Sequence, residues 1–223
     1  MKPKPRLSRR KPAAEKGPGR RTENKEKTRQ AILRAALELF ASQGFYRTTT
    51  KAISRKAGIA EGTLFNYFRT KEDLAVYFLE QELEAVINWY ENDTRIQKAA
   101  LPEQLFAIIQ RSLDGFAPYE EFVGAVFLRG LMPSSKLGPW SLQTKSRSLR
   151  YLRFIQDVLA NAEDREEIPR VGDFGVYAFG LFHAAILTHW LHDCSPGKER
   201  TLALMDRCLN LGSDFLTKRS WNW

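Results

Sequence analysis

The chain has 223 residues, of which 43% are apolar, and it carries a formal net charge of +9 at pH 7. This length allows one or two globular domains, no continuous apolar run reaches the roughly 18 residues of a membrane span, and no apolar stretch behind the basic N-terminus has the form of a secretory signal. Its two cysteines, Cys194 and Cys208, form no CxxC pair, so a reduced compartment, the cytoplasm, is the simplest interpretation.

The positive charge is concentrated at one end of the chain. Residues 1–30 contain 12 Lys or Arg and 3 Glu, whereas the rest contains 23 basic and 23 acidic residues. Clustered basic side chains gain free energy by releasing counterions from nucleic-acid phosphates. A membrane surface is the competing partner, but the segment lacks the Trp, Leu and Phe that an interfacial helix needs. The charge pattern therefore favours a nucleic acid, and no membrane.

We predict that residues 1–22 form a disordered basic arm, because they are rich in Pro, Gly, Lys and Arg and cannot offset their ordering entropy. The arm has two open interpretations. Its arginines can enter an A·T-rich minor groove, as other N-terminal arms do. Alternatively, the arm is a solubilising tail that attracts phosphates diffusely. The arginines concerned are Arg6, Arg9, Arg10, Arg20 and Arg21.

Three short helical patterns follow the arm. From Glu23, apolar residues recur at helical spacing up to Phe40, and Gly44 is a helix stop. Residues 48–50 are all Thr and can cap a second helix, which Gly58 ends. A third helix is expected over 61–68, and Thr70 to Asp73 has the form of a capping box that opens a long fourth helix.

The segment 49–68 has the physical requirements of a helix-turn-helix. Ile53 and Ala57 share the inner face of its first helix, Gly58 allows the turn, and Leu64 and Phe68 hold the second helix from the same side. A surface of small, polar and aromatic residues is then left to face outward, which suits a DNA major groove. These outward residues are Glu61, Gly62, Thr63, Phe65, Asn66 and Tyr67.

The residues of this segment resemble the DNA-binding head of the TetR family of bacterial repressors. The matching pattern is Thr-Thr, then Ile, Ala-Gly-Ile, Gly-Thr-Leu-Phe-x-Tyr-Phe, and Lys-Glu-Asp-Leu three residues on, within about residues 25–85. The resemblance implies a regulator, not an enzyme: a homodimer with no cofactor that binds a palindromic operator and is released by a small apolar effector. It also implies a helix-turn-helix domain over 23–70 and a helical effector-binding and dimerisation domain over 71–223.

The resemblance gives roles to matched positions. It implies backbone contacts from Thr49, Thr50 and Lys51 and a phosphate contact from Lys71. Thr63, Phe65, Asn66 and Tyr67, beside Gly62, occupy the positions of the recognition helix. Two alternatives stay open: Tyr67 contacts a phosphate or is a packed aromatic, and Phe65 contacts a thymine methyl group or lies in the core of the head. Ala60 replaces the usual capping Ser, a loss of about 0.5–2 kcal/mol.

The rest of the chain predicts an all-α fold of about nine helices, since it has no alternating strand pattern. The later helices are expected over 102–116, 120–131, 142–162, 171–193 and 196–218. The last two are apolar on two sides, which indicates that one side faces the core and the other a partner subunit. The faces expected at this dimer interface are Phe174, Ala178, Leu181 and Ala185, and Leu202, Met205, Leu209, Gly212 and Leu216.

Aromatic residues of the middle helices are candidates for the lining of an apolar effector pocket. They are Phe106, Phe116, Phe127, Trp140, Tyr151, Phe154, Tyr177 and Phe182. Two other classes of function remain as alternatives. A DNA-binding protein without an effector would have no enclosed cavity. An enzyme with a basic tether would need a phosphate loop, a nucleophile–base set or metal ligands, and the sequence has none of these; His189, His192 and Cys194 alone do not make a zinc site.

Overall fold

The computed structural model describes residues 19–130 and 145–218, and every regular element within these ranges is helical, which confirms the predicted all-α class. Each of the nine expected helices has a counterpart, and α5, which Asp93 caps, is an additional single turn. The elements are α1 (Arg20–Gln43), α2 (Thr50–Lys56), α3 (Glu61–Phe65), α4 (Lys71–Asn92), α5 (Thr94–Gln97), α6 (Leu101–Phe116), η1 (Ala117–Tyr119), α7 (Glu120–Gly130), α8 (Lys145–Asp164), α9 (Gly172–His192), η2 (Pro196–Lys198) and α10 (Glu199–Lys218).

The helix ends follow the signals in the sequence. α1 begins at Arg20, a few residues before the predicted start, and ends before Gly44, whose φ of +82° is a conformation that favours glycine. The Thr49 side chain accepts a hydrogen bond from the Ala52 N–H at the start of α2. Thr70 and Asp73 form the predicted capping box at the start of α4, with both bonds at 3.1 Å. Residues 1–18 of the predicted arm lie outside the described residues.

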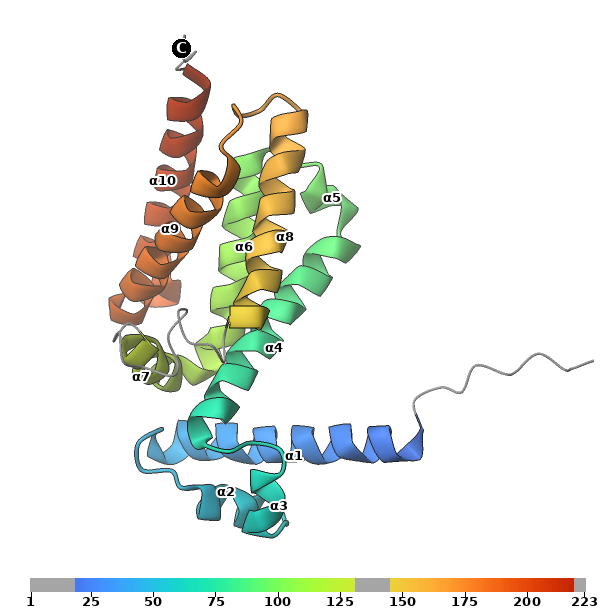
Figure 1. Cartoon of the computed structure of the whole chain (residues 1–223). Coiled ribbons are helices and arrows are strands. Elements are labelled where there is room, and N and C mark those ends of the chain that lie inside the picture. The colour runs from blue at the N-terminus through green and yellow to red at the C-terminus, as the bar shows by residue number, and fades with distance from the viewer. Residues whose placement is uncertain (1–18, 131–144, 219–223) are drawn as a thin grey trace, which may run out of the picture.

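The molecule consists of a small head and an upright helical body (Figure 1). Helices α1, α2 and α3 form the head, with α1 lying across the foot of the body. α4 leaves the head and rises into the body, where it packs on α6 and α8. α6 also contacts α10, and α8 contacts α9. α7 lies at the lower end of the body, next to α1.

Aromatic rings fill the junction between head and body. Phe40 of α1 stacks on Phe122 of α7 with ring centroids 4.7 Å apart and planes at 15°. Phe45, between α1 and α2, and Phe78 of α4 contact the same Phe122 ring at 5.7 Å and 5.6 Å. All four side chains are at most 2% exposed. The head is therefore joined to the body by a continuous apolar core, and the two parts are not separate globules on a linker.

α9 turns one apolar face inward and leaves a second uncovered. Its buried face includes Val176, Phe179 and Ile186. On the opposite side Phe174 and Leu181 are 78% and 75% exposed, and the predicted interface residues Ala178 and Ala185 are exposed too. An uncovered apolar face of this kind matches the prediction that a partner subunit covers it.

Four of the five interface residues predicted on α10 lie on the face that turns toward the core of the chain. Met205 is fully buried within the chain, and three of the others pack partly buried against the core: Leu202, Leu209 and Leu216. Leu211 and Phe215 are exposed instead, at 62% and 53%. α10 has two apolar faces, and its packing on α6 decides which of them turns inward. Among the predicted α10 positions, Gly212 is exposed.

Within the described ranges, α9 is the one helix that is long and apolar enough, by length and composition, to cross a membrane. The sequence-based prediction of no membrane segment rested on the absence of a continuous apolar run of that length. It is therefore qualified for α9, which meets the criterion of length and average composition although polar residues interrupt it. The physical reason is the double apolar face, since α9 packs on α7, α8 and α10 with one side while Phe174, Tyr177 and Leu181 project from the other.

Candidate nucleic-acid interface and effector cavity

Helices α2 and α3 form the helix-turn-helix that the sequence predicted. Ile53 and Leu64 are fully buried and Phe68 is 5% exposed, so these three residues are core. The turn between the helices contains Gly58 with a φ of +70°, which a side chain would resist. Ala60 caps α3 without a side-chain hydrogen bond, as its replacement of Ser predicts.

The surface of α3 that faces away from the core carries the predicted recognition residues. Gly62, Phe65 and Asn66 are exposed, and Thr63 and Tyr67 are partly buried. α3 is shorter than expected: after Phe65 the chain continues as a turn in which the N–H groups of Asn66 and Tyr67 donate to carbonyls three residues earlier. Phe65 is 45% exposed, so its ring is not part of the core of the head. Tyr67 packs against the core with part of its ring.

A side-chain hydrogen bond fixes the two helices relative to each other. The Thr50 hydroxyl donates to Glu61 Oε1 at 2.9 Å, which joins the first residue of α2 to the first residue of α3. The sequence suggested only a helix-dipole role for Glu61. Lys51, next to Thr50, is exposed and available for the predicted backbone contact. The Thr49 hydroxyl oxygen serves as the cap of α2.

Lys71 has a role inside the head that differs from the predicted phosphate contact. Its ammonium donates to the backbone carbonyls of Phe45, Tyr46 and Thr48 at 2.9, 3.2 and 3.3 Å, and it lies 4.6 Å from the Phe45 ring centroid. In this structure Lys71 therefore fixes the loop before α2 to the start of α4, and its phosphate contact stays a prediction.

The loop that Lys71 holds presents two residues that sequence reasoning missed. Tyr46 is 63% exposed and Arg47 is also exposed, directly before the Thr residues that begin α2. An arginine and a phenol beside the helix-turn-helix are suited to phosphate contacts. The available signal was an aromatic and a basic residue between the helix stop Gly44 and the cap Thr49.

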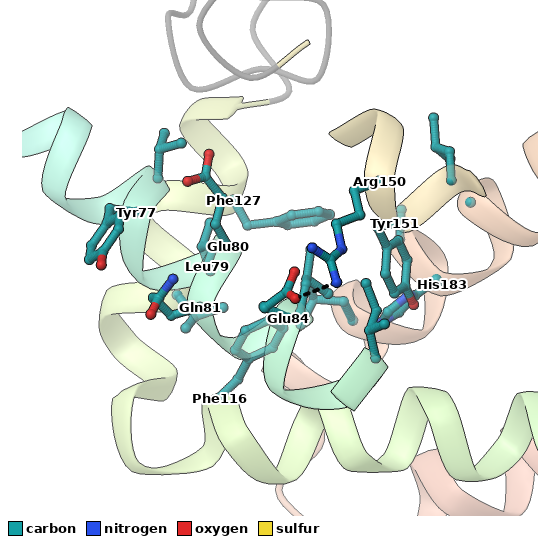
Figure 2. A pocket seen from close by; sticks show the side chains of 18 of the residues that line it. Tyr77, Leu79, Glu80, Gln81, Glu84, Phe116, Phe127, Arg150, Tyr151 and His183 are labelled. Carbon is teal, nitrogen blue, oxygen red and sulfur yellow. Dashed lines mark hydrogen bonds and ion pairs between the residues drawn. The ribbon is translucent and has the colours of Figure 1, made fainter. Parts of the chain in front are cut away.

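A cavity of about 640 Å³ lies in the body between α4, α6, α7, α8 and α9. This volume is within the range of small-molecule sites, about 300–1,000 Å³. Three predicted pocket residues line it: Phe116, Phe127 and Tyr151 (Figure 2). α4 contributes more of the wall than any other helix, through residues that sequence reasoning did not assign: Val76, Tyr77, Leu79, Glu80, Gln81, Leu83, Glu84 and Ile87.

The other predicted pocket residues lie elsewhere. Phe154 is buried in the core and Phe106 packs partly buried against it. Tyr177 is 62% exposed on the uncovered face of α9. Phe182 lines a smaller apolar groove of about 280 Å³ between α9 and α10. Trp140 lies outside the described residues. The sequence pattern identifies aromatic residues in the body but does not fix which side of each helix meets the cavity.

Besides Tyr77, Glu80 and Gln81 of α4, the cavity wall contains two pairs of interacting polar side chains. Glu84 and Arg150 form an ion pair at 2.7 Å, with the Arg150 side chain 59% exposed, and Figure 2 shows this pair across the cavity between α4 and α8. On the α8–α9 side, the Tyr151 hydroxyl lies 3.1 Å from His183 Nδ1. Burial lowers the pKa of His183 to about 4 and raises the pKa of Tyr151 well above its usual value, so both groups are neutral at pH 7.

Tyr77 connects the cavity wall with the head. The residue lines the cavity, and its hydroxyl donates to Glu26 Oε1 at 3.3 Å and accepts from Gln30 Nε2 at 3.4 Å, both on α1. The Arg29 guanidinium lies 5.6 Å from the centroid of its ring. The ring also contacts Phe68, directly after the recognition segment, at 5.4 Å between centroids. A molecule in the cavity would therefore touch a side chain that holds two parts of the head.

The histidines near the end of α9 make hydrogen bonds with neighbouring groups. His189 Nδ1 lies 2.9 Å from the Thr201 hydroxyl, and His192 Nδ1 lies 2.8 Å from the Thr188 carbonyl. In the described part of the chain, no three His, Cys, Asp or Glu residues are grouped as metal ligands would be. Cys194 and Cys208 are unpaired thiols.

Comparison with known proteins identifies the head. The family model described as "Bacterial regulatory proteins, tetR family" matches residues 32–77. The fatty acid metabolism regulator protein of Bacillus subtilis (strain 168) is 31% identical over 80 residues, which are 36% of this chain and 41% of that protein. The HTH-type transcriptional regulator SrpR of Pseudomonas putida is 28% identical over 146 residues, 65% of each chain. The chain thus spans less than two thirds of the length of these curated relatives.

Solved structures share the fold over almost their whole length. Thermus thermophilus FadR, a TetR-family transcriptional repressor in complex with lauroyl-CoA, superposes with a TM-score of 0.63 at 21% sequence identity. The superposition covers 82% of this chain and 94% of that one. At this level of identity the likeness shows the fold alone, and it extends from the head through the helical body.

The carbonyl contacts of Lys71 predict a structural effect of its substitution. Lys71→Met keeps the stem and removes the ammonium, so the free energy of unfolding should fall by about 1–3 kcal/mol, the cost of losing hydrogen bonds to a charged group. The matched control is Lys51→Met, which changes an exposed side chain and should alter stability by less than about 0.5 kcal/mol. Chemical denaturation of both variants measures this, and equal stabilities would contradict the role given to Lys71.

Buried, neutral His183 predicts a loss of stability in acid. Its folded pKa of about 4 lies below the unfolded value of 6.5, so the unfolded chain takes up the proton first as the pH falls. The His183 contribution should therefore cost stability from about pH 6.5 down to pH 4, reaching about 3 kcal/mol at 1.36 kcal/mol per pKa unit. Denaturation at pH 7 and pH 4.5 should show a smaller difference for His183→Gln than for wild type. The exposed His192→Gln should behave like wild type.

Proposed function

We propose that this chain is a TetR-type regulator, because the family model "Bacterial regulatory proteins, tetR family" matches its head, and that it acts as a homodimeric transcriptional repressor that binds a palindromic operator and is released by a small apolar effector. The observation that carries the proposal is the helix-turn-helix, with its exposed recognition surface at one end of the molecule, joined by α4 to a body that contains a cavity. A protein that acts on DNA in a bacterium works in the cytoplasm, and we propose that location.

The DNA contacts divide into base and backbone contacts. Thr63, Phe65 and Asn66, beside Gly62, would meet base edges in the major groove, because they lie on the outward side of α3. Lys51, with Thr49 and Thr50, would contact the phosphates at the start of α2. Tyr67 stays a candidate for either role. Arg47 and Tyr46 join the backbone group on the strength of their exposure.

Dimerisation would cover the uncovered faces of α9 and α10. The predicted α9 face and the corrected α10 face together present large apolar side chains to solvent: Phe174, Tyr177 and Leu181 with Leu204, Leu211 and Phe215. Exposed apolar side chains on adjacent helices favour a two-fold interface, since the same patch on a second copy is complementary in character. The two heads of such a dimer would read half-sites about one helical turn or more apart.

Effector release is supported by the cavity and by its connections to the head. Val123 and Phe127 of α7 line the cavity while the neighbouring Phe122 stacks on α1, and Tyr77 of α4 lines it while bonded to Glu26. An effector that prefers a different spacing of α4 and α7 would shift the head positions and so the population competent for DNA. An acyl chain is one candidate occupant, because a repressor of the same fold carries lauroyl-CoA.

The alternative is a DNA-binding regulator without an effector. It would need no cavity in the body, so the volume of about 640 Å³ favours the effector-responsive form. The sign of regulation, repression or activation, depends on where the operator lies relative to a promoter. A DNA-release assay tests this with lauroyl-CoA and with neutral single-chain amphiphiles at increasing concentration: release by any of them supports the effector-responsive form, whereas a constitutive regulator would stay bound with all of them.

The division of contacts predicts two classes of variant. Lys51→Ala should weaken binding to every DNA sequence and make the slope of log affinity against log salt shallower by about one unit. Asn66→Ala should instead relax the preference at particular base pairs, by about 1–3 kcal/mol. Operators selected from random DNA, measured by fluorescence anisotropy at two salt concentrations, provide the test. If both variants changed only the non-specific affinity, the recognition face would be assigned wrongly.

The uncovered face predicts a homodimer that a charge can disrupt. Leu181→Glu places a carboxylate in the centre of the exposed α9 face and should shift the protein from dimer to monomer at micromolar concentration. Leu187→Val, on the buried side of α9, should leave the oligomeric state unchanged. Light scattering decides the matter, since a wild-type mass near 25.7 kDa would contradict the dimer.

A further inference from the structure

The wall of the cavity formed by α8 and α9 offers a hydrogen bond that the protein itself does not use. His183 is 9% exposed and lines the cavity. Its Nδ1 is paired with the Tyr151 hydroxyl at 3.1 Å, and within the described ranges its Nε2 has no hydrogen-bond partner in the protein. Within the described ranges Nε2 is not one of the fully buried polar atoms that lack a partner, so it is accessible to a group in the cavity, and a ligand that pairs with it gains a hydrogen bond there.

The chemistry of this position is neutral. In a neutral imidazole one nitrogen donates a hydrogen bond and the other accepts one. Nε2 therefore donates if Nδ1 accepts from the Tyr151 hydroxyl, and accepts if Nδ1 donates to it. A ligand hydroxyl group can pair with Nε2 in either case, because it can both donate and accept. A ligand carbonyl group can pair with Nε2 only when Nε2 donates. Burial that keeps His183 uncharged equally disfavours a ligand carboxylate or ammonium directly beside it, because such a group would lose its hydration next to a neutral imidazole.

The rest of the lining is largely apolar, with polar side chains from two helices: Glu80, Gln81 and Glu84 of α4 and Arg150 of α8. Side chains of α4, α6 and α7 form the body of the wall, among them Leu79, Phe116 and Phe127. The charges of Glu84 and Arg150 neutralise each other in an ion pair. Their side chains are 32% and 59% exposed, so the pair lies toward solvent. Figure 2 shows Tyr151 and His183 on the opposite wall from Tyr77 and Glu80. An occupant can thus place an apolar body along α4 and a polar end at His183.

We propose that the cavity binds a neutral amphiphile, with an apolar body against α4 and α7 and a single hydroxyl or carbonyl group hydrogen-bonded to His183 Nε2. The inference rests on the proposed role of the cavity as an effector site and specifies the ligand class. Tyr151 acts as a positioning residue, because its bond to Nδ1 holds the imidazole ring with Nε2 toward the cavity.

The test is a titration of the full-length protein, without DNA, with four single-chain probes of similar length. They are 1-decanol, 2-undecanone, decanoate and decylammonium, each below its solubility or micelle limit, followed by calorimetry at pH 7.5. At least one neutral probe should bind about tenfold or more tightly than both charged probes. Tighter or equal binding of decanoate or decylammonium, or no saturable binding of either neutral probe, would overturn the proposal.

Variants locate the bound polar group. His183→Leu should weaken the neutral probe by about three- to tenfold, the range of one net hydrogen bond, while His183→Gln should recover part of this loss. The matched control is His189→Leu, because His189 bonds to Thr201 and does not line the cavity; an equal loss there would contradict the assignment. The comparison of neutral with charged probes uses the wild-type protein alone. It therefore decides the proposal even if His183→Leu does not fold.

Failure of the proposed ligand class can be distinguished from failure of the proposed regulatory function. Neutral probes that bind with His183 dependence but do not release operator DNA would leave the ligand class standing and reject effector control. Operator binding that responds to charged probes alone would support a regulator and reject the neutral amphiphile.

Discussion

The stacked rings of Phe40 and Phe122 set the geometry on which the rest of the molecule depends. They lie 4.7 Å apart within a cluster of buried aromatic side chains and join α1 to α7. Burying large aromatic side chains stabilises by a few kcal/mol each, since removing one from a core costs about 3–5 kcal/mol. Because this contact is between head and body, the position of the helix-turn-helix is coupled to the packing of α7. A hinge with polar, solvated surfaces would not impose such a constraint.

The same constraint brings the two candidate sites into one mechanical unit. α7 presents Phe122 to the head and Val123 and Phe127 to the cavity, so a small shift of this helix affects both. Tyr77 of α4 makes a second connection, with its ring at the cavity and its hydroxyl on α1. Packed interiors transmit displacement because they have few voids to absorb it. Effector control in this chain would then act through side chains that serve both parts at once.

Several polar side chains that look suited to ligand contact hold the protein together instead. Lys71 donates to three carbonyls of the loop before α2, and Glu61 accepts from Thr50 between α2 and α3. These interactions fix the backbone that carries the recognition residues, so they act on DNA indirectly. His183 is the contrasting case, because half of its hydrogen-bonding capacity is spent on Tyr151 and the other half faces the cavity. The distinction depends on which acceptors lie nearby in space.

The sequence by itself determined the class of fold, the helix-turn-helix and several of the helix ends, because these depend on neighbours a few residues apart. Gly44, Gly58 and the Thr70–Asp73 capping box act within one turn of backbone, and the structure shows each as predicted. What only the tertiary structure decided was orientation. Periodicity found two apolar faces on α10 but could not tell that Met205 packs inward while Leu211 remains exposed. It found aromatic residues in the body but not that α4 contributes more of the cavity wall than any other helix. Both depend on contacts between helices distant in sequence, which a pattern along one helix does not contain.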